Sequence, residues 1–334
     1  MQLFLNQSFE RSREVTSSLS IEPLEILDLF AGCGGWSYGF TYPEVRDHFH
    51  VKYAVDVEPS VEATYKRNIP SAKFILSDIM DLDPRDYADV DVVVGSPPCQ
   101  LFSIGNNSNK ARDPKEGMKL VKVFREWIKV IKPRYWIMEN VKEIIDYLPI
   151  GKYPTRRILN TAYYGIPQQR ERCFSGNYIV PTVTRAKHKT VNLLGKTLHK
   201  WITLREAIAD LIEIPAGYVV TDQMGKKPMA NSPYFSPDSP SRTVTTIGLM
   251  LVHRSVMYDK KKKRMRGGLD DVPEDDLYKK LTVRQLARLQ GFPDGFEFLG
   301  ESQSANYTMV GNAVPPLMAR HFAGMIAMDH ECLT

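Results

Sequence analysis

The sequence predicts an α/β fold built on a doubly wound, mostly parallel sheet. Short runs of β-branched and other apolar residues recur along the first half of the chain, and most are followed by a loop and a helical stretch. Near-continuous apolar runs are typical of strands that are buried on both faces. Strand and helix in alternation favour a parallel sheet with helices on both faces, and such sheets bind ligands at the carboxyl ends of their strands.

Length and composition are those of an ordinary globular protein. The chain has 334 residues, of which 43% are hydrophobic and 25% charged, so it can bury a large core and divide into two lobes. Residues 1–20 are polar and no long apolar segment follows, so we expect no secretory signal and no membrane span. The expected location is the cytoplasm, in association with the nucleoid.

The cysteines indicate reduced thiols. Cys33, Cys99, Cys173 and Cys332 show neither C-x-x-C spacing nor the density of a disulfide framework. We therefore expect no disulfide and no metal site.

Positive charge is concentrated in one region. The formal net charge is +5, but residues 181–267 hold 16 of the 44 Lys and Arg residues against 6 of the 39 Asp and Glu residues. A basic region on a mildly acidic body favours a polyanion partner, and therefore nucleic acid. A solvated loop would show the same bias, so charge alone leaves both interpretations open.

The first strand is expected over residues 25–30, and it ends in a glycine-rich turn. Residues 31–35 read Ala-Gly-Cys-Gly-Gly and lead into a short helix over 36–40. Glycine lets the backbone approach a ligand closely. The spacing is not G-x-G-x-x-G and no Walker lysine follows, so a nucleoside without phosphates fits better than a phosphate cradle. The alternative is a tight turn that binds nothing.

The next two units place acids at strand ends. A strand over 51–55 reaches Asp56, and a helix over 59–68 follows. An acid in this place can bind the two hydroxyls of a ribose. A third strand, over 73–76, leads into Asp78, whose carboxylate can accept a hydrogen bond from an adenine amino group.

The fourth strand delivers a cysteine. A β-branched run over 90–94 is followed by Gly-Ser-Pro-Pro and then Cys99. The two prolines end the strand and restrict the backbone before the thiol, so Cys99 lies in a loop at a strand end, where active-site residues are expected. A lone cysteine is more often a buried hydrophobe. The polar loop over 103–117 is either a lid that closes over substrate or an ordinary surface loop.

The fifth strand delivers a carboxylate. An amphipathic helix over 120–132 is expected to end at Pro133, and a strand over 135–138 then leads into Glu139. A carboxylate at a buried strand end costs free energy unless it is paired or used, so Glu139 is a candidate site residue.

Two arginines follow in an extended block. Alternation along a strand places Arg170 and Arg172 on one face and Glu171 on the other. Two fixed cations beside a thiol and a carboxylate suit the binding of a base and its phosphate, and a surface strand is the alternative.

Together these segments resemble the cytosine-C5 DNA methyltransferase family of bacterial and archaeal restriction-modification systems. The motifs of that family occur in the expected order and span nearly the whole chain. They are residues 28–35, Asp56, 77–79, Pro98-Cys99-Gln100, Glu139-Asn140-Val141, 168–172, 284–293 and 311–314.

The resemblance implies a Rossmann-like methyltransferase sheet in a discontinuous domain. Residues 1–175, completed by 303–334, would form the catalytic and S-adenosylmethionine-binding domain, with a helix around 315–328 returning to it. Residues 176–302 would form a smaller, irregular target recognition domain that binds DNA and contains the basic excess.

The resemblance also implies a reaction. A methyl group would pass from S-adenosylmethionine to C5 of a cytosine flipped out of a specific double-stranded DNA sequence. Cys99 would add to C6, and Glu139 would hold N3 and the exocyclic amine. Arg172 would stabilise the O2 side, and Arg170 the neighbouring phosphate or the loop. No metal is required, a monomer is expected, and a cognate restriction endonuclease would act separately.

By the same resemblance, two further groups of residues are assigned to ligands. The cofactor residues would be Phe30, Gly32, Cys33, Gly34, Asp56, Val57, Asp78, Ile79, Pro98, Leu120 and Asn312. The DNA-contacting residues would be Gln100, Ser103, Arg242, Thr243, Lys261 and Lys263. The lysine run over 260–263 fits a phosphate clamp better than a sequence reader.

Two features depart from the family pattern, and two alternatives stay open. The segment between Val141 and Gly165 is short, which suggests that a helix or a strand of the sheet is trimmed. Ala313 stands where many relatives carry serine, at the cost of one hydrogen bond near the cofactor. The alternatives are a tRNA cytosine-C5 methyltransferase, whose Cys-Phe-Thr signature Cys173-Phe174-Ser175 matches only superficially, and a DNA-binding paralogue without catalysis.

Overall fold

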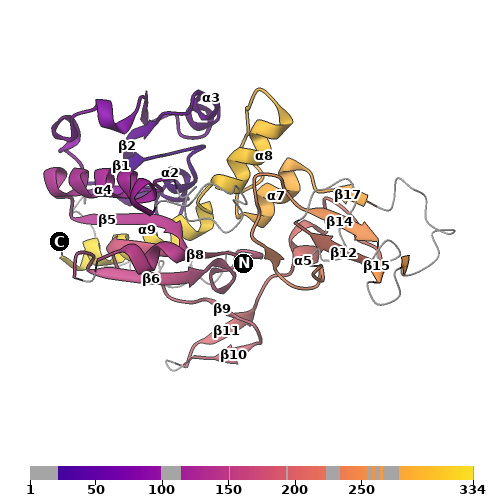
Figure 1. Cartoon of the computed structure of the whole chain (residues 1–334). Coiled ribbons are helices and arrows are strands. Elements are labelled where there is room, and N and C mark those ends of the chain that lie inside the picture. The colour runs from indigo at the N-terminus through magenta and orange to yellow at the C-terminus, as the bar shows by residue number, and fades with distance from the viewer. Residues whose placement is uncertain are drawn as a thin grey trace.

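The chain forms a larger lobe around a central sheet and a smaller lobe beside it (Figure 1). The computed structural model describes residues 22–98, 114–149, 151–192, 195–222, 234–253, 258–259, 264–265 and 278–333.

The larger lobe is organised by a seven-stranded sheet with the order β3-β2-β1-β4-β5-β8-β6. Its strands are β1 Leu24–Leu29, β2 Phe49–Asp56, β3 Lys73–Leu76, β4 Val92–Gly95, β5 Tyr135–Val141, β6 Thr155–Asn160 and β8 Glu171–Asn177. Neighbours from β3 to β5 are parallel, whereas β8 runs antiparallel to both β5 and β6. The strand order reverses between β1 and β4, so ligands are expected beyond the carboxyl ends of these two strands.

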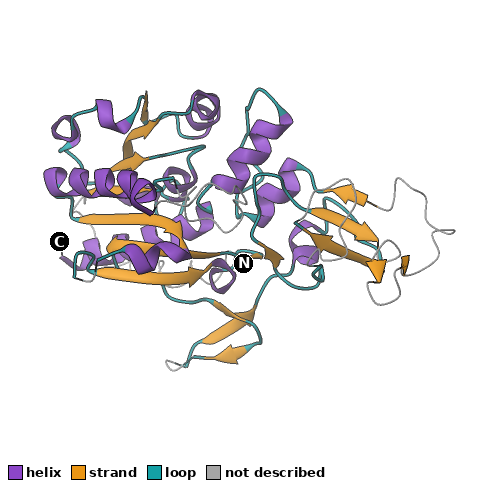
Figure 2. Cartoon of the chain, in the orientation of Figure 1, coloured by secondary structure: helices purple, strands orange, loops and turns teal. Residues whose placement is uncertain are grey.

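Helices cover both faces of this sheet (Figure 2). The helices of the larger lobe are α2 Gly35–Gly39, α3 Pro59–Asn68, α4 Pro114–Ile131 and α9 Pro316–Leu333. Alternate side chains of β4 point to opposite faces of the sheet. Val92 and Val94 pack in the hydrophobic cluster that includes α9, and Val93 packs in the cluster that includes α4. This period of two explains why the strands read as unbroken apolar runs.

The C-terminal helix α9 packs against the N-terminal helix α2. A β-carbon on Gly39 would lie 2.2 Å from that of Ala319, so glycine is required for this approach. Phe322 of α9 also contacts the ring of Trp36 in α2, with the centroids 5.7 Å apart. The predicted return of the C-terminal helix to the sheet is therefore confirmed, while the domain boundaries at 175 and 302 stay a prediction.

Most predicted elements are confirmed within two residues, and the differences have local causes. Helix α4 begins at Pro114, several residues before its apolar stripe starts, and ends at Ile131. Lys132 takes a left-handed backbone conformation with φ 54° ahead of Pro133. In the short segment after β5, the strand β6 is present, and the described residues before it form only the 3-10 turn η4, Lys142–Tyr147. The strand is therefore kept, and the trimming of a helix stays a prediction.

The smaller lobe has its own antiparallel sheet, β12-β14-β17. Its described elements are β12 Tyr218–Thr221, β14 Met250–His253, β17 Tyr278–Lys280, α5 Leu204–Ile208, α7 Val283–Leu289 and α8 Gln303–Asn312. Short strands complete the chain: β7 Gln168–Gln169, β13 Ser241–Arg242, β9 Arg185–Ala186, β10 Thr190–Val191, β11 Thr197–Lys200, β15 Tyr258–Asp259 and β16 Arg264–Met265. The remaining 3-10 turns are η1 Arg46–His48, η2 Ile79–Asp81, η3 Pro84–Tyr87 and η5 Thr161–Tyr164.

One hydrophobic cluster crosses the boundary between the lobes. Cys33 and Val61 of the larger lobe pack in the same cluster as Leu286 of α7 and Met309 of α8. The two lobes therefore share a core at this seam, and α8 lies on the side of the smaller lobe (Figure 1).

Candidate active site at the carboxyl edge of the sheet

The ends of β4 and β5 are tied together by one side chain. Asn140 Nδ2 donates a hydrogen bond of 2.9 Å to the carbonyl oxygen of Pro97. Trp36 Nε1 donates to Ser96 Oγ at 3.1 Å, which holds the same segment from the other side. These bonds position the residues that immediately precede Cys99. Cys99, Gln100 and Ser103 themselves lie outside the described residues.

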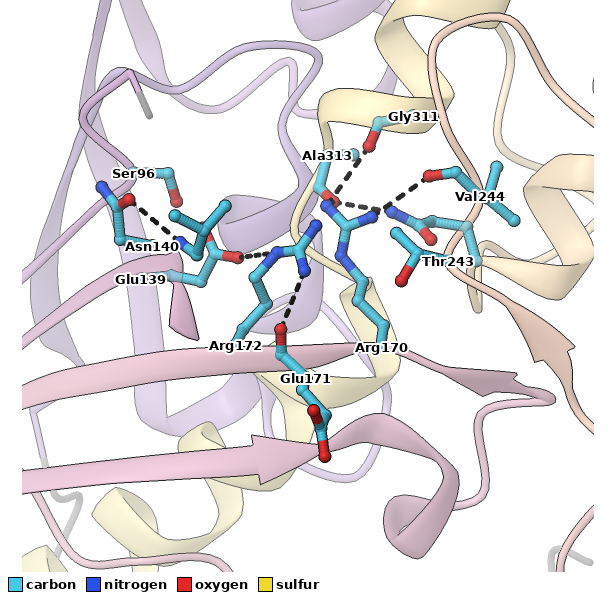
Figure 3. A network of polar contacts seen from close by, with 12 residues as sticks. Ser96, Glu139, Asn140, Arg170, Glu171, Arg172, Thr243, Val244, Gly311 and Ala313 are labelled. Carbon is cyan, nitrogen blue, oxygen red and sulfur yellow. Dashed lines mark hydrogen bonds and ion pairs between the residues drawn. The ribbon is translucent and has the colours of Figure 1, made fainter. Parts of the chain in front are cut away.

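Glu139 and Arg172 form a buried ion pair beside this segment (Figure 3). Arg172 Nε lies 3.2 Å from Glu139 Oε1, and the side chains are only 16% and 8% exposed. In the antiparallel register Arg172 faces Val141, so Glu139 is its diagonal neighbour on the same face of the sheet. Removing a carboxylate from water is costly unless a cation compensates it, and Arg172 supplies that cation.

Arg170 shares the face of Arg172 but has different partners. Its buried guanidinium donates to the carbonyl oxygens of Val244 at 3.3 Å, Gly311 at 3.2 Å and Ala313 at 3.3 Å (Figure 3). Glu171 points the other way and pairs with Lys142 at 2.7 Å, as alternation predicted.

The family resemblance implies that Arg170 contacts the neighbouring DNA phosphate or the loop. A contact with a DNA phosphate would require the guanidinium to leave carbonyl groups at the seam between the lobes. Its burial therefore favours a positioning role, and the predicted phosphate contact stays untested.

Two buried glutamines extend this network, and the sequence reasoning did not single them out. Gln168 Oε1 accepts from the backbone N–H of Val244 at 2.8 Å, and Gln168 Nε2 donates to Gln290 Oε1. Gln290 Nε2 in turn donates to the carbonyl oxygen of Ala313 at 2.7 Å. Both glutamines lie in motif segments, and this membership was the available signal in the sequence. Because the contacts at Ala313 use its carbonyl group, they do not depend on a serine side chain.

The glycine-rich turn is fastened to the end of β2. Gly32 and Gly34 have φ values of 54° and 95°, which favour glycine. The backbone N–H of Gly32 donates to Asp56 Oδ2 at 2.7 Å, and that of Glu58 donates to Asp56 Oδ1 at 2.9 Å. Burial raises the pKa of the Asp56 carboxyl above its usual range, while these two hydrogen bonds act in the opposite direction.

Several predicted cofactor residues are gathered along this edge. Val57 exposes 64% of its surface directly after β2, although it is apolar. Ile79 is buried, and Asp78 accepts from the backbone N–H of Met80 at 2.9 Å. Pro98 follows β4 and Asn312 ends α8, and both are exposed. An exposed apolar side chain among strand ends is a surface that a planar ligand can cover.

Phe30, Leu120 and Cys33 differ in what they offer a ligand. Phe30 has a φ of 57°, a rare conformation for a residue other than glycine, and Leu120 is partly buried. Cys33 is buried, with Sγ 3.7 Å from the carbonyl oxygen of Met309. Burial raises the pKa of its thiol to about 12. The side chain of Cys33 packs in the core that the two lobes share, so only its backbone is available to a ligand at the turn.

Arg242 and Thr243 lie beside the arginine block. Strand β13 pairs in parallel with β7, which places Arg242 opposite Gln169. Thr243 Oγ1 donates to the carbonyl oxygen of Gln169 at 3.3 Å, whereas Arg242 is exposed. Lys261 and Lys263 lie outside the described residues, so their predicted DNA contacts stay predictions.

The family model for C-5 cytosine-specific DNA methylases matches residues 24–147 and 152–327. This chain belongs to that family. It is similar to the type II methyltransferase M.MthTI of Methanothermobacter thermautotrophicus, with 29% identity over 92% of this chain and 98% of that protein. It is also similar to the type II methyltransferase M1.HphI of Haemophilus parahaemolyticus, with 30% identity over 90% of this chain and 86% of that protein.

Solved structures support the fold. A mutant of Spodoptera frugiperda DNMT2 superposes with a TM-score of 0.62 at 18% identity, covering 91% of this chain and 99% of that one. A putative DNA modification methyltransferase encoded within an Escherichia coli prophage superposes with a TM-score of 0.57 at 19% identity, covering 91% and 98%. The fold is a Rossmann-like methyltransferase fold.

The family determines the enzyme class. The chain is a DNA cytosine-5-methyltransferase. Among the described residues, no helix has the length and hydropathy of a membrane span. The same residues contain no group of three or more His, Cys, Asp or Glu side chains arranged to hold a metal ion.

Proposed function

We propose that this enzyme transfers the methyl group of S-adenosylmethionine to C5 of a flipped-out cytosine, through a covalent bond between Cys99 and C6. One observation carries the proposal. Glu139, which pairs with Arg172 of β8, lies on β5 next to β4, the strand that leads to Cys99, and Asn140 joins the ends of β4 and β5 through Pro97.

Each residue of this set has a chemical task. The Cys99 thiolate forms a bond to C6, and the electron pair of the C5–C6 double bond moves toward C5 and N3. Glu139, within reach of N3, shares a proton with it as negative charge builds in the ring. Arg172 holds the Glu139 carboxylate in place and faces the O2 side. After C5 is methylated, the C5 proton passes to water, the C5–H electron pair re-forms the C5–C6 double bond, and the C6–S bond breaks to release the thiolate.

The edge of the sheet fits S-adenosylmethionine. Val57 offers exposed apolar surface for the adenine, and each Asp56 oxygen accepts one backbone N–H and keeps a lone pair for a ribose hydroxyl. The glycine turn after β1 and Asn312 would hold the methionine end, with Leu120 and Pro98 at the sides. When bound, this cofactor supplies an electrophilic methyl group on a sulfonium. The mechanism requires no metal.

Base flipping follows from the geometry that the reaction demands. Attack at C6 and methylation at C5 take place above and below the ring plane, which stacking blocks inside a duplex. Unstacking costs a few kcal/mol. We propose that backbone contacts of the smaller lobe, including Arg242 and Thr243, offset this cost.

The wider setting belongs to the same proposal. The named relatives are type II methyltransferases, which supports a role in a restriction-modification system. We propose a monomer in the cytoplasm, acting on chromosomal DNA separately from any cognate endonuclease. Residues 1–175 with 303–334 would form the catalytic domain, and 176–302 the target recognition domain. In this division α8 would be the part of the catalytic domain that packs against the smaller lobe at the seam.

Bisulfite sequencing of plasmid DNA from cells that express the protein tests the reaction and the sequence context together. We expect protected cytosines that share one flanking sequence. If no cytosine is protected by an expressed and folded protein, the proposed reaction is wrong.

A mechanism-based trap tests the nucleophile. DNA that carries 5-fluorocytosine at the identified position cannot lose the C5 substituent as a proton, so the C6–S bond should persist through denaturing electrophoresis. The wild type and Cys332→Ser, which changes an exposed thiol, should both form the adduct. Cys99→Ser should form none while it still binds DNA, and an adduct in that variant would exclude Cys99.

A further inference from the structure

A small ribbon of three strands projects from the seam between the two lobes (Figure 1). It consists of β9, β10 and β11 in the order β10-β11-β9. Strands β10 and β11 are antiparallel, and β9 runs parallel to β11. None of its described side chains belongs to the hydrophobic clusters of either lobe, and Val191 is 60% exposed.

All the charged residues of this ribbon are basic. Residues 185–200 contain five Lys and Arg residues, two His residues and no Asp or Glu. Four of the cations are the exposed lysines Lys187, Lys189, Lys196 and Lys200. In the part of the chain that the structure describes, none of these four forms an ion pair.

Arg185, the fifth cation, and the nearby Glu206 have structural tasks. Arg185 Nη1 donates to the carbonyl oxygen of Lys200 at 2.7 Å, which joins β9 to β11. Glu206 accepts from the backbone N–H of Thr203 at 2.8 Å and caps α5; this hydrogen bond lowers the pKa of Glu206, and the charge of Lys200 adds a smaller lowering. Glu206 offsets at most one of these charges, so the ribbon keeps an excess of positive charge.

The ribbon is anchored to η5, the 3-10 turn that precedes the arginine block. The backbone N–H of Thr184 donates to the carbonyl oxygen of Tyr163 at 3.0 Å, and that of Trp201 donates to Ala186 at 2.9 Å. The rings of Tyr163 and Trp201 meet edge to face with centroids 5.1 Å apart. Tyr163 lies in η5, only a few residues before the arginine block. The lysines therefore have a defined position relative to the catalytic residues.

We propose that the ribbon binds the phosphate backbone of DNA that flanks the recognition sequence. The substrate of this family is a polyanion, and unpaired lysines on a projecting ribbon at the seam complement it. Lysine acts on phosphate as a point charge, without the planar fork that reads base edges. The ribbon therefore adds affinity that depends on salt and on duplex length, and it adds no sequence preference.

The test is a charge-neutralised variant of the full chain, K187Q/K189Q/K196Q/K200Q. The matched control, K66Q/K73Q/K129Q/K132Q, removes the same charge at exposed positions of the larger lobe. DNA binding is measured by fluorescence anisotropy at several salt concentrations. The probes share one methylation site at their centre, with total lengths of about 14 and about 40 base pairs.

On the long duplex, the ribbon variant should bind at least about tenfold more weakly than the control at moderate salt. Its slope of log affinity against log salt should be shallower by about 2 to 4, because each lost phosphate contact removes about 0.9. On the short duplex the two variants should agree, and both should keep wild-type turnover when DNA is saturating.

Two outcomes would overturn the proposal. Equal affinities of ribbon variant and control on both duplexes would show that the lysines contact something other than DNA. An equal loss on both duplexes would place them within the recognition sequence. Failure of the proposed reaction is recognised separately, because then the wild type would methylate neither duplex.

Discussion

At the scale of single residues, two arginines separated by one position have different tasks because their surroundings differ. Arg172 faces a carboxylate at the edge of the sheet, whereas Arg170 faces carbonyl groups at the seam. Alternation along the strand predicts that they share a face. It does not predict which partner each one meets, since the partners come from distant parts of the chain.

Glu139→Gln should reduce turnover by at least about a hundredfold, because an amide cannot share a proton with N3. Transfer of a labelled methyl group to DNA measures the rate, and calorimetry with the product of the cofactor measures binding, which should stay near wild type. Glu171→Gln is the matched control, since Glu171 is an exposed partner of Lys142 one strand away. Wild-type turnover in Glu139→Gln would exclude the proton role.

Asp28 makes stability depend on pH. It is fully buried, and its Oδ2 accepts from Ser37 Oγ at 2.6 Å, while Oδ1 has no hydrogen-bond partner among the described residues. Burial raises the pKa of its carboxyl from 3.8 to about 7. Between these values the folded state binds more protons than the unfolded state, so the free energy of unfolding falls as the pH rises.

Asp28→Asn should remove this component. Relative to the variant, the wild type should lose up to about 4 kcal/mol of stability between about pH 4 and pH 7, measured by urea unfolding. Asp86→Asn, at an exposed position of η3, should follow the wild-type profile. Parallel profiles for the wild type and Asp28→Asn would show that Asp28 is ionised throughout this range.

At the scale of elements, the end of α8 depends on a close approach between backbones. A β-carbon on Gly311 would lie 2.4 Å from the carbonyl carbon of Thr245, which belongs to the segment after β13. Backbone cannot yield as a flexible side chain can. This contact places Asn312 beside the segment that carries Arg242 and Thr243.

Gly311→Ala should therefore separate α8 from that segment, with a loss of stability of about 1 to 3 kcal/mol and a raised KM for DNA. Gly324→Ala is the control, because nothing lies within 4 Å of a β-carbon at this position of α9. That variant should gain up to about 1 kcal/mol from helix propensity. Thermal unfolding measures both, and a stable Gly311→Ala with normal KM would contradict the contact.

At the scale of the whole molecule, a buried polar network holds the lobes together. Arg170, Gln168 and Gln290 reach Val244 on one side and Ala313 on the other. A network of this kind is stabilising only when all its polar groups have hydrogen-bond partners. Removal of Arg170, its central cation, should therefore weaken the contacts between the two lobes.

Arg170→Met should lower the free energy of unfolding by about 3 kcal/mol, since several carbonyl groups lose a charged donor. It should also raise KM for DNA more than it lowers kcat, because Val244 adjoins the predicted DNA-contacting residues. Arg157→Met is the control, as this exposed guanidinium bonds only the neighbouring carbonyl of Arg156 in the described structure. A drop in kcat alone would instead indicate direct contact with the substrate.

Much of the larger lobe could be predicted because its signals are local. The helix over 59–68 is confirmed to the residue, since Glu58 accepts from the backbone N–H of Ser60 and Pro59 occupies the first helical turn. Glu139 was predicted from the cost of a carboxylate after a buried strand, and the structure shows how Arg172 compensates it. The start of α4 was missed because its first turn lacks the apolar stripe.

The amino-acid sequence by itself determined the parallel strands of the sheet, the order of the motifs, and the strand ends at which the chemistry is expected. These depend on periodicity and turn residues, which act between neighbours along the chain. Only the tertiary structure decided that Asn140 donates to Pro97 and that Arg170 donates to carbonyl groups between the lobes. It also decided that the Cys33 side chain packs in the core and that Lys187 to Lys200 lie on one ribbon. Such contacts join residues that are distant in sequence, and no local pattern specifies which of them meet when the chain closes.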